Sequence, residues 1–220
     1  MAASQRFLLA VFAVLVLCGF GAFVAFTSDF RAGAGSGAIG GPFALTAGDG
    51  TIVTDRSLRG RWMLIYFGYT NCPNICPTTL SAVADALDKL GPLAGKVQPL
   101  FVTVDPERDT PAAVAEYTKA FDPRIIGLTG APAEISAVAK EYRVFVKKVP
   151  GKTPSEYWVE HSSYLYVVGP DGSYATLIAD SQDSAAIASR LSELLPPSRH
   201  SETGRRRGPT ETSVAAYWGD

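Results

Sequence analysis

The chain has 220 residues, enough for one domain of ordinary size with additional segments. Its 20 basic and 21 acidic residues give a formal net charge of −1, which provides no electrostatic footprint for nucleic acid. Only three cysteines occur, so disulfides cannot form the framework of the fold and a packed core must stabilise it.

The amino-terminal part contains the run FLLAVFAVLVLCGFGAFVAF, residues 7–26, without a charged side chain. A helix needs about 20 apolar residues to cross a bilayer, so we expect an uncleaved membrane anchor here. A cleaved signal peptide is less favoured, because its apolar region is usually about 7–15 residues long. A lipoprotein acylated at Cys18 is disfavoured by Leu17, since such signals normally carry a small residue there. A buried core helix is disfavoured because the run is apolar on every face.

The charges beside this run predict its orientation. Arg6 and the amino terminus precede it, and Asp29 and Arg31 follow it. By the positive-inside tendency, residues 1–6 are expected in the cytoplasm. We therefore expect a single-pass protein of the inner membrane, with its soluble domain on the periplasmic side.

Two segments beyond the anchor have the composition of linkers. Residues 27–41 are rich in Gly, Ala and Ser and predict a flexible tether. Residues 196–220 are polar, low in aliphatic side chains and interrupted by proline, and predict a disordered tail. The folded domain is thereby predicted to span residues 42–195.

Strand-like and helix-like patterns alternate within this domain. Apolar runs predict strands buried on both faces, and apolar residues at helical spacing predict the helices between them. This alternation predicts an α/β domain of three layers. Pro99, inside the third strand-like segment, predicts that this strand begins late. The predicted strands lie at 43–55 (a hairpin turning at Gly48-Asp49-Gly50), 62–69, 97–105, 125–130, 145–149, 157–161, 164–172 and 175–180, and the predicted helices at 77–90, 111–121, 131–142 and 183–195.

Two cysteines lie in GYTNCPNICPTTL, residues 68–80, where a predicted strand gives way to a helix. Ligands and redox centres favour that edge of an α/β sheet. Pro77 suits the first helical turn, so Cys76 lies where backbone N–H groups and the helix dipole favour a thiolate. The spacing of Cys72 and Cys76 permits a disulfide, or two thiolates opened around a metal. The third interpretation is that both cysteines stay reduced and only contribute to packing.

His161 is the candidate third ligand, because the only other histidine, His200, lies in the predicted tail. A lone histidine beside a strand is more often a structural residue. This one directly precedes SSYLYVVGPDG, however, and in thioredoxin-like domains the segment that enters this hairpin faces the cysteine loop. Two sulfurs and one imidazole suit Cu(I), which accepts three ligands, whereas structural zinc normally needs four.

A third motif is TVDPERDTP, residues 103–111. Its simplest interpretation is turn and capping chemistry, with Asp109 or Thr110 opening the helix that follows. Asp105 ends a strand next to the cysteine strand, so we expect it as an accessory carboxylate near the metal.

The motifs GYTNCPNICPTTL, VTVDPERDTP and EHSSYLYVVGPDG, in this order behind an apolar span, resemble the Sco/SenC family of thioredoxin-like copper proteins. The resemblance covers residues 42–195 and implies a thioredoxin-like core with an added amino-terminal hairpin. It implies copper, as Cu(I) and also Cu(II), held by Cys72, Cys76 and His161. Glu160 stands where the family usually has Asp.

The resemblance also implies a function and partners. The expected function is delivery of copper to the dinuclear copper centre of cytochrome c oxidase during assembly. The alternative is a thiol–disulfide reductase in which Cys72 and Cys76 are the catalytic pair and keep that centre's cysteines reduced. The third interpretation is an interaction module with an inert cysteine pair. The expected partners are the copper-receiving subunit of the oxidase and an upstream copper donor or thiol reductant. The sequence favours a metal-binding chaperone over an enzyme.

Overall fold

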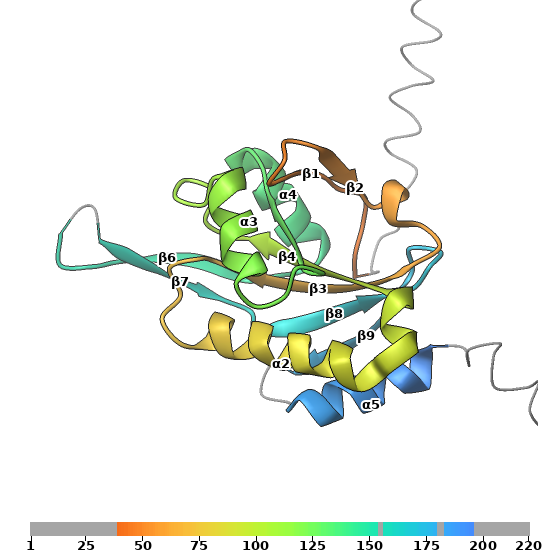
Figure 1. The fold of residues 1–220 in the computed structure, drawn as a ribbon. Coiled ribbons are helices and arrows are strands. Elements are labelled where there is room, and N and C mark those ends of the chain that lie inside the picture. Colours follow the sequence, from red (N-terminus) through yellow and green to blue (C-terminus); the bar gives the residue numbers. More distant parts are fainter. Residues whose placement is uncertain (1–38, 154–155, 180–182, 196–220) are drawn as a thin grey trace, which may run out of the picture.

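The computed structural model describes residues 39–153, 156–179 and 183–195 (Figure 1). The predicted cytoplasmic segment, anchor and tail, and most of the tether, lie outside these residues. Among the residues that are described, no helix is long and apolar enough to cross a membrane.

A seven-stranded mixed sheet forms the centre of the domain, and its three middle strands β5, β4 and β3 are parallel. The hairpin β1–β2 joins one side of these strands, and the hairpin β8–β9 joins the other side in antiparallel pairing. The sheet thus confirms the predicted amino-terminal hairpin. In spatial order its strands are β2 (Ile52–Thr54), β1 (Ala44–Ala47), β5 (Ile126–Thr129), β4 (Val97–Thr103), β3 (Trp62–Gly68), β8 (Tyr164–Val168) and β9 (Tyr174–Ala179).

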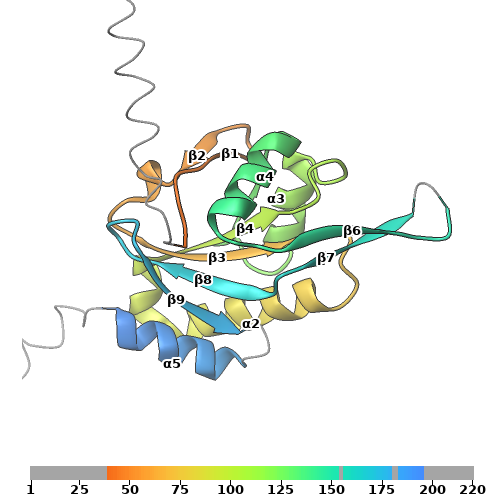
Figure 2. The same ribbon diagram turned by 180° about the vertical axis from the view of Figure 1, so that it is seen from behind.

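Two further strands, β6 (Val146–Pro150) and β7 (Tyr157–His161), pair only with each other. They extend from the body of the domain as a two-stranded projection, which we call the arm (Figures 1 and 2). Every residue of β6 is at least partly exposed, whereas β7 buries Val159 in the core.

Helices cover both faces of the sheet and complete the predicted three layers (Figures 1 and 2). The helices α2 and α5 lie side by side on one face, in the core cluster that includes Leu80 and Leu191. The helix α4 packs on the other face through Ile135 and Val138. The helical segments are η1 (Arg56–Leu58), α2 (Ile75–Leu90), η2 (Gly91–Lys96), α3 (Pro111–Lys119), α4 (Pro132–Glu141) and α5 (Ser184–Leu194).

The apolar run of β3 shows why the sheet lies between two cores. Each residue from Met63 to Phe67 is at most 1% exposed. Alternate side chains point to opposite faces of a strand, so Ile65 and Phe67 enter one core cluster while Leu64 and Tyr66 enter the other. Burial of each large apolar side chain contributes roughly 1.5–3 kcal/mol, which makes β3 the most firmly fixed support for the loop that follows it.

The prediction of a late start for the strand around Pro99 is wrong. β4 begins at Val97, and Pro99 stands opposite Leu64 of β3 within the ladder. The strand tolerates proline because β5 pairs with β4 only from Leu100 onward, so one side of β4 has no strand partner at this point. The Pro99 carbonyl instead accepts a hydrogen bond from the side chain of Gln98.

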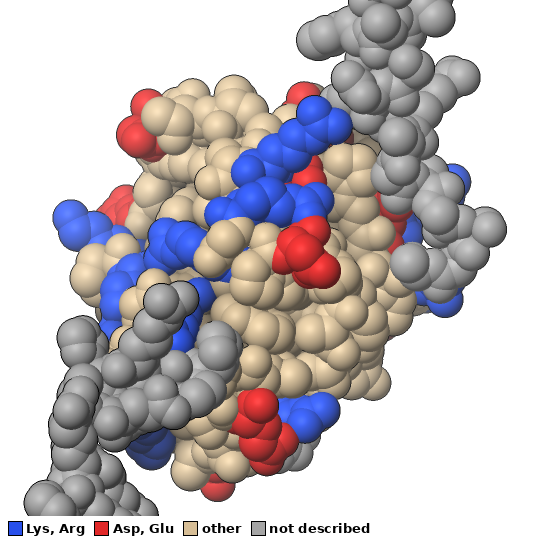
Figure 3. All heavy atoms as spheres, turned by 90° about the vertical axis from the view of Figure 1, so that its right-hand side faces the viewer, with Lys and Arg blue, Asp and Glu red and all other residues tan. Residues whose placement is uncertain are grey.

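One end of the sheet carries a band of basic side chains. Figure 3 shows the end on the right of Figure 1, where lysine and arginine side chains form a band with a few acidic side chains beside it. β3 begins at this end and runs away from it toward the start of α2 (Figure 1). The band therefore lies at the opposite end of the sheet from the cysteine loop.

Candidate metal centre

The cysteine loop connects the end of β3 to the start of α2. α2 begins at Ile75, two residues before the predicted start, which places Cys76 in its first turn and Cys72 in the loop before it. His161 is the last residue of β7. β8 follows it closely and pairs antiparallel with β3, so the chain entering β8 comes beside the end of β3. The fold thus brings together residues far apart in sequence.

The sulfur atoms of Cys72 and Cys76 and a ring nitrogen of His161 all lie within 4.8 Å of one another. His161 Nε2 is 3.7 Å from Cys76 Sγ, and the Cys76 backbone N–H donates to Cys72 Sγ at 3.5 Å. His161 Nδ1 lies 3.1 Å from the Ser162 carbonyl oxygen, an arrangement in which Nδ1 carries the proton and Nε2 is free to bind a metal.

The two cysteines differ in exposure and in proton affinity. Cys76 is buried and Cys72 is half-buried, and neither is in a disulfide. The hydrogen bond from the Cys76 thiol lowers the pKa of Cys72, against the opposing effect of burial. That same bond, together with burial, raises the pKa of Cys76. The pair therefore shares one proton, which Cys76 keeps, and Cys72 is the thiolate.

Aromatic side chains form the walls of the site. Burial raises the pKa of the Tyr66 phenol, so its hydroxyl keeps its proton and donates to Cys76 Sγ at 3.7 Å. The Tyr69 ring meets the His161 ring edge-on, with centroids 5.8 Å apart and an interplanar angle of 87°. Sequence reasoning missed both tyrosines as parts of the site, since their aromatic character alone is fully accounted for by core packing.

Gly68, the last residue of β3, gives the Cys76 sulfur its space. A β-carbon at this position would lie 2.9 Å from Cys76 Sγ and 2.8 Å from a ring carbon of Phe101. Both separations are shorter than van der Waals contact, so the absence of a side chain at this position is a steric requirement of the site.

Asp109 fixes the beginning of the cysteine loop and was also missed. Its buried carboxylate accepts hydrogen bonds from the Thr70 N–H and hydroxyl and from the Thr103 hydroxyl. Thr110 performs the capping role that the sequence left open between these two neighbours, because its side chain accepts from the N–H of Ala113. Asp109 thus ties the loop that carries Cys72 to the end of β4.

Asp105 is placed differently from the three candidate ligands. Its side chain is buried, forms an ion pair with Arg108 and accepts a hydrogen bond from the Tyr157 hydroxyl at 2.7 Å. It is not among the donor atoms that cluster within 4.8 Å. An accessory role of Asp105 at a metal stays a prediction.

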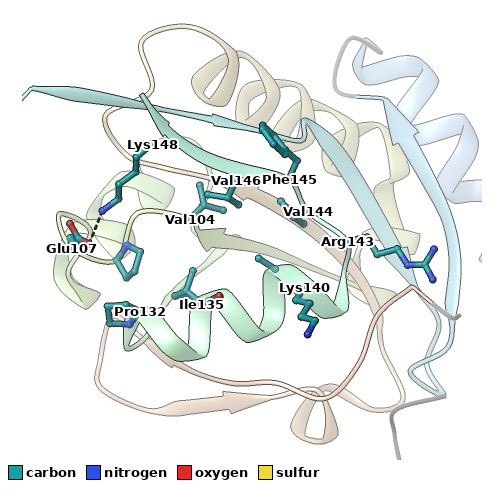
Figure 4. Close-up of a pocket in the computed structure, with 13 residues that line it drawn as sticks. Val104, Glu107, Pro132, Ile135, Lys140, Arg143, Val144, Phe145, Val146 and Lys148 are labelled. Atoms are coloured by element: carbon teal, nitrogen blue, oxygen red, sulfur yellow. Dashed lines mark ion pairs between the residues drawn. The ribbon is translucent and has the colours of Figure 1, made fainter. Parts of the chain in front are cut away.

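A groove of about 610 Å³ lies between α4 and β6 (Figure 4). Its lining includes Val104, Ile135, Phe145 and Lys148, and it contains none of the three candidate ligands. The groove therefore separates part of the arm from the domain without forming the metal centre.

The donor set determines which metal the site fits. Within the described part of the chain, Cys72, Cys76 and His161 form the only group of three or more potential ligand side chains close enough to share an ion. Two thiolates and one imidazole are soft donors that suit Cu(I), whereas a structural zinc site normally has four protein ligands. Fold and site together define a thioredoxin-like domain with a candidate copper site beyond the end of β3.

The chain belongs to the SCO1/SenC family, whose model matches residues 31–196. A curated relative is the mitochondrial SCO1 homolog 1 of Arabidopsis thaliana, 46% identical over 151 residues, which are 68% of this chain and 45% of that protein. The chain thus spans about half the length of the curated relatives it matches.

Solved structures confirm the fold. The structure of Bradyrhizobium japonicum ScoI with copper bound is 44% identical, with a TM-score of 0.67 over 72% of this chain and 100% of that one. BsSco, described as a member of the Sco family of cytochrome c oxidase assembly proteins with a disulfide switch, is 27% identical with a TM-score of 0.57, over 70% of this chain and 92% of its own. The predicted thioredoxin-like domain is therefore confirmed.

Proposed function

We propose that this protein is a metallochaperone that binds one copper ion through Cys72, Cys76 and His161 and delivers it to the dinuclear copper centre of cytochrome c oxidase during assembly. The observation that carries the proposal is the soft donor set, whose three ligand atoms lie within 4.8 Å of one another. The copper-bound ScoI structure and the description of BsSco as an oxidase assembly protein support the same assignment.

The unequal burial of the two sulfurs suits stepwise transfer. Cys72 is half-buried, so a thiolate of the copper-receiving subunit can replace it first. Cys76 is buried and His161 is partly buried, so they hold the ion until the partner's second ligand arrives. Copper exchanges one sulfur ligand for another in this transfer and no electron moves. Cys76, whose pKa is raised, takes up a proton when the ion leaves.

A thiol–disulfide reductase is the second candidate, favoured by the thiolate at Cys72 beside a protonated Cys76. In that reaction the Cys72 sulfur attacks a disulfide of the partner and releases one partner thiolate. Cys76, once deprotonated, attacks Cys72, forms the internal disulfide and releases the second partner thiolate. The partner gains two electrons, and an upstream thiol reductant restores the pair.

The proposed location follows from the apolar run at residues 7–26, which would hold the domain at the inner membrane with the metal centre on the periplasmic side. The run has the length of a membrane-crossing helix. The partners in this proposal are the copper-receiving oxidase subunit and an upstream donor of copper or of reducing equivalents.

A Cu(I) titration of the purified protein against a competing chelator tests the copper assignment. We expect one copper per chain, and an affinity lower by about 10–100-fold or more in His161→Ala, because losing a ligand should cost more than changing a residue that only supports a ligand. His200→Ala is the matched control and should bind as the wild type. Thiol–disulfide exchange should survive in His161→Ala, since imidazole is not required for attack of one sulfur on another.

Oxidase assembly in cells that carry His161→Ala separates the two candidate functions. If assembly fails and added copper restores it, copper delivery is the function. Normal assembly despite lost copper binding would contradict the chaperone and support the reductase.

A further inference from the structure

We propose that Arg108, in the motif of residues 103–111, is a positioning residue for the metal centre: it holds Tyr157 and thereby the strand that ends in His161. The inference rests on the proposed copper function, and it assigns a role to a motif that the metal ligands leave unused. Arg108 contacts neither sulfur in the structure and acts through the arm.

The Arg108 guanidinium lies against the Tyr157 ring, 3.7 Å from its centroid. Its Nη1 donates to the Tyr157 carbonyl oxygen at 3.1 Å. Its Nε pairs with the carboxylate of Asp105, which also accepts the Tyr157 hydroxyl at 2.7 Å. Arg108 and Asp105 therefore hold the ring, the hydroxyl and the backbone of Tyr157 at once. A planar guanidinium can combine stacking and directed hydrogen bonds in this way.

The position of the arm shows why such contacts matter. β6 pairs with β7 alone and has no partner strand in the main sheet. The groove between α4 and β6 leaves part of the arm without packing beneath it (Figure 4). A second ion pair crosses from the arm to the same motif, since Lys148 Nζ lies 2.6 Å from a carboxylate oxygen of Glu107. Both sets of contacts that hold the arm therefore involve residues 105–108.

The contacts reach His161 by two routes. Tyr157 and His161 are the first and last residues of β7 and share one face of it, because alternate side chains of a strand point the same way. Arg108 also lies 5.9 Å from the centroid of the Tyr69 ring, which packs edge-on against His161. Holding Tyr157 therefore restricts the position of the imidazole, whereas the two sulfurs come from α2 and from the loop before it.

The test is a double-mutant cycle of Arg108→Ala and His161→Ala, with affinity for Cu(I) measured in each variant. Changing a residue that supports a metal ligand typically costs about 10–100-fold in metal affinity, and we expect a loss of about tenfold for Arg108→Ala alone. In the His161→Ala background the same change should cost less than about twofold, because Arg108 acts through the missing ligand. Arg124→Ala is the matched control, since Arg124 also pairs with nearby carboxylates but at another site.

Hydrogen exchange of the metal-free protein provides the second readout. Amides of β7 should exchange faster in Arg108→Ala, while those of α5 stay as in the wild type. Should Arg108→Ala fail to fold, Arg108→Lys and Tyr157→Phe take its place, with the same direction and a smaller size of effect.

Wild-type copper affinity in Arg108→Ala, or an equal loss with and without His161, would overturn the inference. Unchanged exchange in β7 would overturn it as well. If the wild-type protein binds no copper, the proposed function fails, and the exchange comparison still decides whether Arg108 holds the arm.

Discussion

The two cysteines and the histidine of the candidate site come from regions that are stabilised in different ways. Cys76 is 0% exposed and lies in the core cluster between the sheet and α2. His161 comes from the arm, in whose strand β6 every residue is at least partly exposed. The cysteine pair is therefore fixed by the main core, and His161 by contacts at the edge of the domain.

This difference predicts that the two halves of the site respond differently to change. Local opening costs least where few apolar contacts are buried, so the arm should open more readily than the cysteine loop. In the proposed copper function, an ion that has left Cys72 could then lose its imidazole before it loses the buried sulfur of Cys76.

Removal of either sulfur should abolish stoichiometric Cu(I) binding. In Cys72→Ser or Cys76→Ser one thiolate and one imidazole remain, a poor site for Cu(I). Copper analysis of the purified variants provides the measurement. Cys18→Ser, which alters the remaining cysteine of the chain, is the control and should bind one copper. Tight binding of one copper by either sulfur variant would refute the ligand assignment.

Gly68→Ala should lower the stability of the protein, because the added methyl group would clash with atoms around the cysteine pair. The added β-carbon would lie 2.9 Å from Cys76 Sγ, so the sulfur or the Phe101 ring must move. Overpacking of this kind typically costs about 1–3 kcal/mol of stability, and denaturant unfolding would measure it. Gly95→Ala is the control, because a β-carbon there has no atom within 4 Å. Equal stability of the two variants would show that the contact at Gly68 relaxes freely.

Copper binding should release one proton per ion near neutral pH. The pKa of Cys72 is lowered and that of Cys76 is raised, so between these two values the metal-free pair holds a single proton. Within this window the proton on Cys76 competes with copper for the sulfur. Raising the pH weakens this competition, so the apparent affinity for Cu(I) should increase about tenfold per pH unit. Proton release in weakly buffered solution measures the stoichiometry. Release of two protons would mean that Cys72 is a thiol before binding.

The smallest effects should distinguish two neighbouring lysines of the arm. Lys148 pairs with Glu107 at 2.6 Å, whereas Lys147 lies 3.9 Å from Glu160 within the arm itself. Lys148→Ala should lower the free energy of arm opening by up to about 1 kcal/mol, and Lys147→Ala by less than about 0.5 kcal/mol. Hydrogen exchange of the β7 amides in the two variants measures the difference. A larger effect of Lys147→Ala would indicate that the ion pair to Glu107 does not fasten the arm.

The strands and helices are predictable from the sequence because they depend on local patterns, whereas the grouping of His161 with the two cysteines is expected from its place before a strand hairpin and from the resemblance to the Sco/SenC family. Apolar runs mark β3 and β4, and Asp183 caps α5 at the expected helix start. The supports of the site could not be predicted in the same way. The bonds from Asp109 to Thr70 join residues 39 positions apart, and the contact of Arg108 with Tyr157 joins residues 49 apart. Such contacts exist only after the sheet has formed, and a capping or turn role explains the same residues equally well beforehand.

The pairing of β8 with β3 has a consequence for the order of events during synthesis. Cys76 leaves the ribosome 85 residues before His161, so the dithiol exists for a time without its imidazole. His161 can reach the two sulfurs only after β8 has paired with β3. The proposed three-coordinate copper site can therefore form only in a chain in which this pairing is complete.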